Sequence, residues 1–211
     1  MFSPRKNSAA KIMMCSLLSA STGGIVSAYL KPLIMGTYSE THRYDVGALT
    51  NGILAGLVSI TGTCDSCEPW SAVLIGFIGS VFYTCACKLW QKIGIDDPIE
   101  ASQVHAACGL WGLFAVGIFH AEKGLISSST ESLSFLGVQC MGALCIICWV
   151  SFFATSFFII MKKLNLLRVP LVHEIIGLDI TEMGSSVSID SIIAQAIFRA
   201  HQQAMKAQRY K

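Results

Sequence analysis

Five long apolar runs dominate this chain of 211 residues. They cover residues 9–30, 46–64, 70–90, 99–119 and 133–161. Each run is close to or above the ~20 residues that a helix needs to cross the hydrocarbon core of a bilayer. Because lipid offers the backbone no hydrogen-bond partner, a helix is the default structure for such a run. The sequence therefore predicts an all-α polytopic membrane protein with five transmembrane helices.

The composition agrees with a chain that lies in lipid. Hydrophobic residues make up 53% of the chain and charged residues only 13%, against about 25% charged residues in a soluble domain. The net charge of +2 is too small, and the basic residues too scattered, to indicate nucleic acid as a partner. The lipid bilayer is the partner that the composition predicts.

Polar residues interrupt the second and the fourth run, which makes these two the weaker transmembrane predictions. The interrupting residues are Asn51, Glu100, Gln103 and His105. Such residues normally face protein or water rather than lipid. Small residues such as Gly52 and Gly56, four positions apart, indicate helices that pack closely.

The connecting segments predict the orientation. One side receives seven basic residues, namely Lys31, Arg43, Lys88, Lys92, Lys162, Lys163 and Arg168. The opposite side holds Lys123 among four acidic residues. Excess Lys and Arg mark cytoplasmic segments, so the C-terminus is predicted to be cytoplasmic. Arg5 and Lys6 before the first run, and Lys11 at its start, oppose this arrangement, which indicates that residue 1 is not a natural beginning.

A series of motifs resembles the ammonium transporter (Amt/Mep/Rh) family, most closely its plant and bacterial-type Amt branch. The series contains NG-x-LAGL from Asn51, T-x-x-C from Thr61, EPW from Glu68, DDP from Asp96 and CG-x-WG from Cys108. It ends with an "LRV…E…GLD" pattern over 167–179. The order of these motifs makes the resemblance specific, and it covers about residues 8–184.

The resemblance implies a fold of eleven spanning helices, of which this chain holds the last five. Residues 8–163 would be a partial transporter domain, 164–184 a cytosolic regulatory tail, and 185–211 an amphipathic helix. In the family, inverted repeats place the substrate path at their interface. The resemblance implies a homotrimer if the chain is full-length, or otherwise an assembly with the missing N-terminal half. It implies the plasma membrane as the location.

His105 lies eight residues after Asp97, where the resemblance places the second of two pore histidines. An imidazole can donate at one nitrogen, accept at the other and exchange protons near neutral pH. The first histidine of the family belongs to a helix outside this sequence. Without the resemblance, a structural histidine that bonds a carbonyl is the simpler interpretation.

Three further positions match the family near the ends of the pore. Thr61 matches a threonine at its outer end, although a threonine that merely ends a helix is an equal alternative. Asp96 and Asp97 would lie at the cytoplasmic mouth, where they attract cations or cap the helix that follows. Capping alone is the simpler interpretation.

Three residues of the tail match the family segment that contacts a neighbouring subunit: Glu174, Gly177 and Asp179. Met183 stands where the family often has histidine, which puts that regulatory contact in question. The last residues, 185–211, carry apolar side chains at helical spacing and basic residues near the end. This pattern is typical of an amphipathic helix on a partner or on the inner leaflet.

Two functions remain open. The first is transport of ammonium or ammonia through a histidine-lined pore, of which this chain is a part that is inactive alone. The second is a non-transporting membrane subunit or an ammonium sensor that keeps the scaffold. The pattern of an enzyme, a cofactor site or a metal site is lacking, since Cys64 and Cys67 form a single C-x-x-C without a second pair.

Overall fold

The computed structural model describes residues 4–36, 45–128, 130–170, 173–174, 178 and 197. Every regular element in these residues is a helix. The elements are α1 (Pro4–Met35), α2 (Val46–Ile60), α3 (Pro69–Ile93), the π-helix η1 (Gln103–Ala107), α4 (Cys108–Phe119), the 3₁₀-helix η2 (Leu125–Ser127) and α5 (Ser132–Lys163). The all-α prediction is confirmed.

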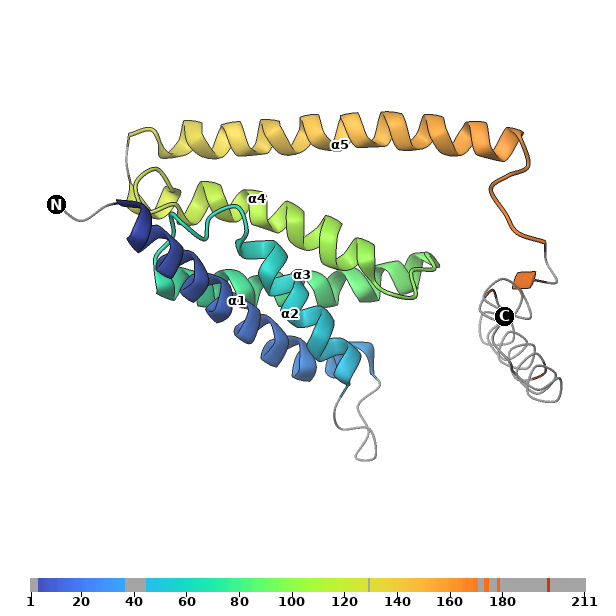
Figure 1. The fold of residues 1–211 in the computed structure, drawn as a ribbon, viewed down its shortest axis with the longest axis horizontal. Helices are drawn as coiled ribbons and strands as arrows, with labels where there is room; N and C mark the ends of the chain where they lie inside the picture. Colours follow the sequence, from blue (N-terminus) through green and yellow to red (C-terminus); the bar gives the residue numbers. More distant parts are fainter. Residues whose placement is uncertain are drawn as a thin grey trace. The chain divides into compact units, whose positions relative to one another are not determined.

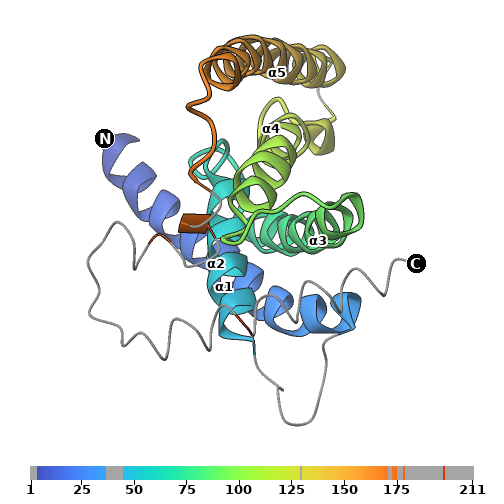
Figure 2. The same cartoon turned by 90° about the vertical axis from the view of Figure 1, so that its right-hand side faces the viewer.

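The chain divides into two compact units, Met1–Ile147 and Cys148–Lys211. The first unit holds α1 to α4, which pack together in Figures 1 and 2, and the start of α5. The second unit holds the rest of α5 and the described part of the tail. The site lies in the first unit.

Three of the helices are long and apolar enough to cross a membrane: Ala9–Met35, Pro69–Ile93 and Ser132–Lys163. The helical segments Val46–Ile60 and Gln103–Phe119 are apolar but shorter. They correspond to the two runs that polar residues interrupt. The second run ends early because residues 61–66 form turns, and the fourth starts late because residues 95–100 contain no helix. The five predicted runs thus appear as helices, with two of them shorter than expected.

Helices α1 to α4 alternate in direction. Near the end of α1, Lys31 bonds to Tyr83 in the later half of α3 and to Glu100 just before η1. Near the start of α1, Lys11 lies 3.7 Å from Glu68, which precedes α3. The start of α1 therefore lies beside the start of α3 and its end beside the later half of α3, so the two helices run in the same direction, as every second helix of an alternating series does.

Small residues let α1 approach α2 and α3 closely. A Cβ atom added at Gly56 in α2 would lie 2.3 Å from the backbone oxygen of Ser19 in α1, and one added at Gly76 in α3 would lie 2.4 Å from the same oxygen. The Ser19 hydroxyl donates to the Gly56 carbonyl at 2.8 Å. The expectation that glycines bring these helices together is confirmed, because backbone contact of this kind has no room for a side chain.

The structure corrects the placement of Lys31. The sequence suggested a cytoplasmic connecting segment, but Lys31 lies inside α1 and is 8% exposed. An amine in that position has to find a counter-ion, because an unpaired charge in a low-dielectric interior is costly. Its partners form part of the site described next.

Candidate functional site

His105 is the central residue of the π-helix η1, between the loop that follows α3 and the start of α4. A π-helix contains one extra residue per turn, and such turns occur frequently at functional sites. The side chain of His105 is exposed, whereas its neighbours Gln103 and Val104 are buried. The π-turn therefore presents the imidazole outward from the described residues while its start is held in the core.

The start of this helical segment is capped by Asp97. The carboxylate of Asp97 accepts hydrogen bonds from the backbone N–H of Ala101 at 3.1 Å and of Ser102 at 2.8 Å. It also accepts one from the Ser102 hydroxyl at 2.6 Å. The bonds from Ser102, first from its hydroxyl and then from its backbone, hold the pKa of Asp97 below its usual value. Asp97 has the geometry of a helix cap.

A second layer of bonds orients Ser102. The indole N–H of Trp90 donates to the Ser102 hydroxyl at 2.9 Å. Because that hydroxyl gives its own proton to Asp97, the amide of Gln103 has to donate to it. With its nitrogen so placed, the Gln103 amide lies 3.0 Å from the Ser102 hydroxyl oxygen and 2.7 Å from an Asp97 oxygen. The end of α3 and the start of η1 are thereby joined by polar side chains.

An ion pair involves Glu100, which lies between Asp97 and the residues that it caps. The amine of Lys31 lies 2.6 Å and 2.7 Å from the two carboxylate oxygens of Glu100. The amide of Asn51 in α2 donates to Glu100 at 2.9 Å, and the Tyr83 hydroxyl in α3 donates to it as well. The Lys31 amine also donates to the Tyr83 hydroxyl at 3.0 Å and lies 5.3 Å from the centre of the Tyr83 ring. These four residues are named the Lys31–Glu100 cluster.

The cluster joins α1, α2, α3 and the segment before η1. Tyr83 is fully buried, and the side chains of Lys31 and Glu100 are 10% and 21% exposed. The sequence indicates that Asn51 and Glu100 face protein or water. That Lys31 and Tyr83 are their partners was not predicted. The available signal was a lysine directly after an apolar run, where the helix can continue. A charged residue inside a membrane normally pairs with an opposite charge.

The other predicted site residues lie apart from the cluster. Thr61 is exposed at the end of α2, and its hydroxyl donates to the Val58 carbonyl at 2.9 Å. Asp96 is exposed in the loop after α3. In the tail, Glu174 accepts a hydrogen bond from Arg168 at 2.5 Å. Gly177, Asp179 and nearly all of 185–211 lie outside the described residues.

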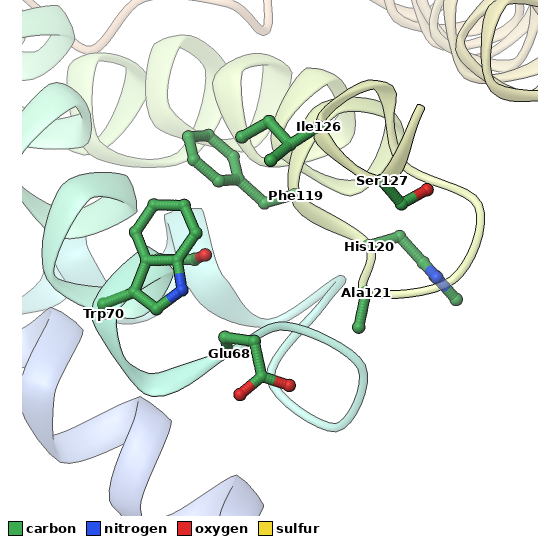
Figure 3. Close-up of a pocket in the computed structure, with 8 residues that line it drawn as sticks. Glu68, Trp70, Phe119, His120, Ala121, Ile126 and Ser127 are labelled. Atoms are coloured by element: carbon green, nitrogen blue, oxygen red, sulfur yellow. The ribbon is translucent and has the colours of Figure 1, made fainter. Parts of the chain in front are cut away.

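The far end of the bundle contains a small pocket of about 170 Å³. Figure 3 shows Glu68, Trp70, Phe119 and His120 around it. Trp70 contacts Phe119 edge to face, with ring centres 6.2 Å apart, and is 52% exposed. Nδ1 of His120 accepts from the backbone N–H groups of Glu122 and Lys123, each at 3.2 Å. This histidine therefore has the structural role of closing a turn.

The residues that the structure describes contain no group of three or more ligands that could hold a metal ion. All nine cysteines are free thiols. Within the described residues, the site consists of the exposed imidazole of His105, the turn that Asp97 caps and the adjoining Lys31–Glu100 cluster.

The sequence matches the Ammonium Transporter Family over residues 2–187. That span contains α1 to α5, His105 and the whole Lys31–Glu100 cluster.

The chain belongs to the Ammonium Transporter Family.

Two curated relatives are plant members of this family. Ammonium transporter 1 member 3 of Solanum lycopersicum is 32% identical over 201 residues, which cover 84% of this chain and 40% of the relative. Ammonium transporter 1 member 1 of Arabidopsis thaliana is 33% identical over 181 residues, which cover 79% of this chain and 34% of the relative. The chain thus spans between a third and two fifths of the length of these relatives.

A solved structure shares the fold. The crystal structure of Saccharomyces cerevisiae Mep2 superposes with a TM-score of 0.67 over 77% of this chain and 38% of that chain, at 24% identity. The Ammonium Transporter Family and the apolar helices together make this chain a multi-pass membrane protein. The family consists of transporters rather than enzymes, as the sequence indicated.

Proposed function

We propose that this chain forms one wall of an ammonium-conducting pore in which His105 lines the substrate path. The observation that carries the proposal is the exposed imidazole on a π-turn of a membrane-embedded bundle. A polar ring that faced lipid there would be costly, so its exposed side is expected to meet protein or water. Ammonium is the substrate because the chain belongs to the Ammonium Transporter Family.

The chemistry of an imidazole suits this substrate. Carrying a dehydrated cation through an apolar bore is costly. The cost falls if the ion gives up its proton and crosses as neutral ammonia. A histidine ring accepts a proton on one nitrogen and donates from the other, close to neutral pH. His105 would therefore exchange protons or hydrogen bonds with the passing molecule.

Further helices are needed to complete the pore. His105 and Thr61 are both exposed on the described residues, so neither is enclosed as a pore residue has to be. The chain also spans only 34–40% of its plant relatives. The completing helices, with a second histidine, would come from a longer form of this chain or from a separate chain. We expect residues 1–211 alone not to conduct.

The other candidate site residues would take the places that the family resemblance gives them. Thr61 would lie at the outer end of the path and Asp96 and Asp97 at the cytoplasmic mouth. The assembled protein would be a homotrimer in the lipid of the plasma membrane, with the C-terminus in the cytoplasm. Glu174, Gly177 and Asp179 would lie in the tail that contacts a neighbouring subunit.

This function can be tested in cells that lack their own ammonium transporters, by measuring their growth on medium with little ammonium. Residues 1–211 alone should not restore growth. Residues 1–211 produced together with the preceding helices of the tomato relative should restore it. His105→Ala should abolish that growth, whereas the matched variant His120→Ala should leave it intact because His120 closes a turn at the far end.

Two results would contradict the proposal. Growth restored equally by the wild-type and His105→Ala assemblies would remove His105 from the path. An assembled, membrane-inserted complex that never restores growth would favour the alternative of a non-transporting subunit or ammonium sensor.

A further inference from the structure

The Lys31–Glu100 cluster places two opposite charges inside an apolar bundle, where apolar residues would be the simpler choice. Replacing a buried ion pair by well-packed apolar residues is often neutral or stabilising, so the presence of such a pair is weak support for a role in stability alone. An ionisable residue inside a membrane segment is more often tied to function. The place of the cluster in the chain indicates what that function is.

Glu100 is connected to the π-turn through its own backbone. Its carbonyl accepts a hydrogen bond from the N–H of Val104 at 3.0 Å, and its N–H donates to the carbonyl of Asp97 at 3.1 Å. Val104 is buried and directly precedes His105. Any shift of Glu100 therefore moves the first turn of the segment that carries the imidazole.

The backbone of Glu100 is held in an unfavourable conformation. Its φ angle is +58°, in the left-handed region that residues with a side chain seldom adopt. Such strain persists only where the surroundings hold it, and it gathers at functional sites. Here the side chain of Glu100 is held by Lys31, Tyr83 and Asn51 from three different helices. The ion pair is thus one of the contacts that hold this turn.

The other end of the π-turn is also fixed. The thiol of Cys108 is fully buried and lies 3.4 Å from the carbonyl of Gly79 in α3 and 3.5 Å from that of Gln103. Both ends of η1 are therefore attached to the bundle. Among the described residues no hydrogen bond to the His105 ring is found, and the ring is exposed, so the backbone of η1 sets its place.

We propose that Lys31 and Glu100 are positioning residues for His105: their ion pair, completed by Tyr83 and Asn51, holds the strained turn that sets the place of the imidazole. The inference rests on the proposed function at one point: that His105 lines the substrate path. The restraint itself is a property of the described residues and can be measured without transport.

Hydrogen–deuterium exchange of the purified chain in detergent micelles tests the restraint. Lys31→Met removes the charge and keeps the length of the side chain. Loss of a hydrogen bond to a charged group changes a local opening equilibrium by about tenfold or more. The amides of residues 103–107 should therefore exchange about tenfold faster in Lys31→Met. The amide of Ala121, which donates to Ser66 at the far end, is the internal control, and its rate should rise by a much smaller factor.

Tyr83→Phe is the milder second variant, since it removes a single hydroxyl from the cluster. It should raise exchange at residues 103–107 by a smaller factor, and that of Ala121 by less still. Proton–carbon NMR of the histidine rings adds a second measurement, which distinguishes a change at His105 from a general destabilisation of the bundle. The Cε1 signal of His105 should shift or broaden in both variants, and that of His120 should stay in place.

Two results would overturn the inference. Unchanged exchange and an unchanged His105 signal in both variants would show that the pair does not restrain the turn. An equal rise at residues 103–107 and at Ala121 in both variants would make the pair a general support of the bundle. Neither result involves ammonium, so both can be distinguished from failure of the transport proposal, which the growth of His105→Ala cells reports.

Discussion

The amine of Lys31 lies within 2.7 Å of both carboxylate oxygens of Glu100, although the two residues are 69 positions apart in the chain. The pair brings the end of α1 to the residues that begin the helical segment of His105. It therefore couples the packing of the bundle to the place of the one ring that the proposed pore depends on. The charges of this pair also make its energetics easy to test.

We expect Lys31→Met to destabilise the protein more than the double variant Lys31→Met/Glu100→Gln. Removing one partner leaves an unpaired buried charge, and breaking a buried pair costs roughly 3–5 kcal/mol. For Lys31→Met we expect a loss in the free energy of unfolding of about 3 kcal/mol, at the low end of this range, because the Glu100 side chain is 21% exposed to solvent. Chemical unfolding in detergent micelles measures both variants. Equal losses in the two would show that the pair is not the source of the effect.

Gly56→Ala is expected to separate α1 from α2. The added Cβ atom would lie 2.3 Å from the Ser19 carbonyl oxygen, which is backbone and cannot turn away. Overpacking of this kind costs about 1–3 kcal/mol. Gly137→Ala in α5 is the matched control, because nothing lies within 4 Å of that position. It should be neutral or slightly stabilising, since alanine favours helix.

Thermal unfolding in micelles measures this pair of variants. A Gly56→Ala protein as stable as the Gly137→Ala protein would contradict the close approach of the two helices.

Asp97→Asn is expected to lower stability at neutral pH and to lose its effect in acid. The pKa of Asp97 in the folded protein is lowered, chiefly by the Ser102 hydroxyl. Its contribution is therefore fully present above the unfolded value of about 3.9 and disappears as the pH falls through the folded value. The melting difference from wild type should stay constant from about pH 5 to pH 8 and close only in stronger acid.

Asp96→Asn, at an exposed neighbour, serves as the control and should follow the wild type throughout. A difference for Asp97→Asn that disappears between pH 5 and pH 8 would mean that another group controls the cap.

Much of this fold could be predicted from hydrophobic runs, because lipid leaves a helix as the default structure. The runs at 70–90 and 133–161 became α3 and α5 with small changes at their ends. The helix of the second run came out shorter because residues 61–66 form turns. That of the fourth run starts late because Glu100, in the non-helical segment before it, belongs to the Lys31–Glu100 cluster. The polarity of Glu100 was visible in the sequence, but its partners were not.

The pairing of Lys31 with Glu100 lay beyond the sequence because it depends on how α1 packs against α3. In the sequence, a basic residue at the end of an apolar run gives no indication of whether its side chain reaches water or points into the bundle. The π-turn was equally hidden, since no residue pattern distinguishes one extra residue in a helical turn. The outward placement of His105 follows from that turn and became visible only in the structure.

Ammonium flux into lipid vesicles is the measurement that tests the account most directly. Vesicles would hold residues 1–211 alone, the chain assembled with the preceding helices of the tomato relative, or that assembly with His105→Ala. We expect flux only from the wild-type assembly. Flux from the His105→Ala assembly equal to that of the wild type would contradict it.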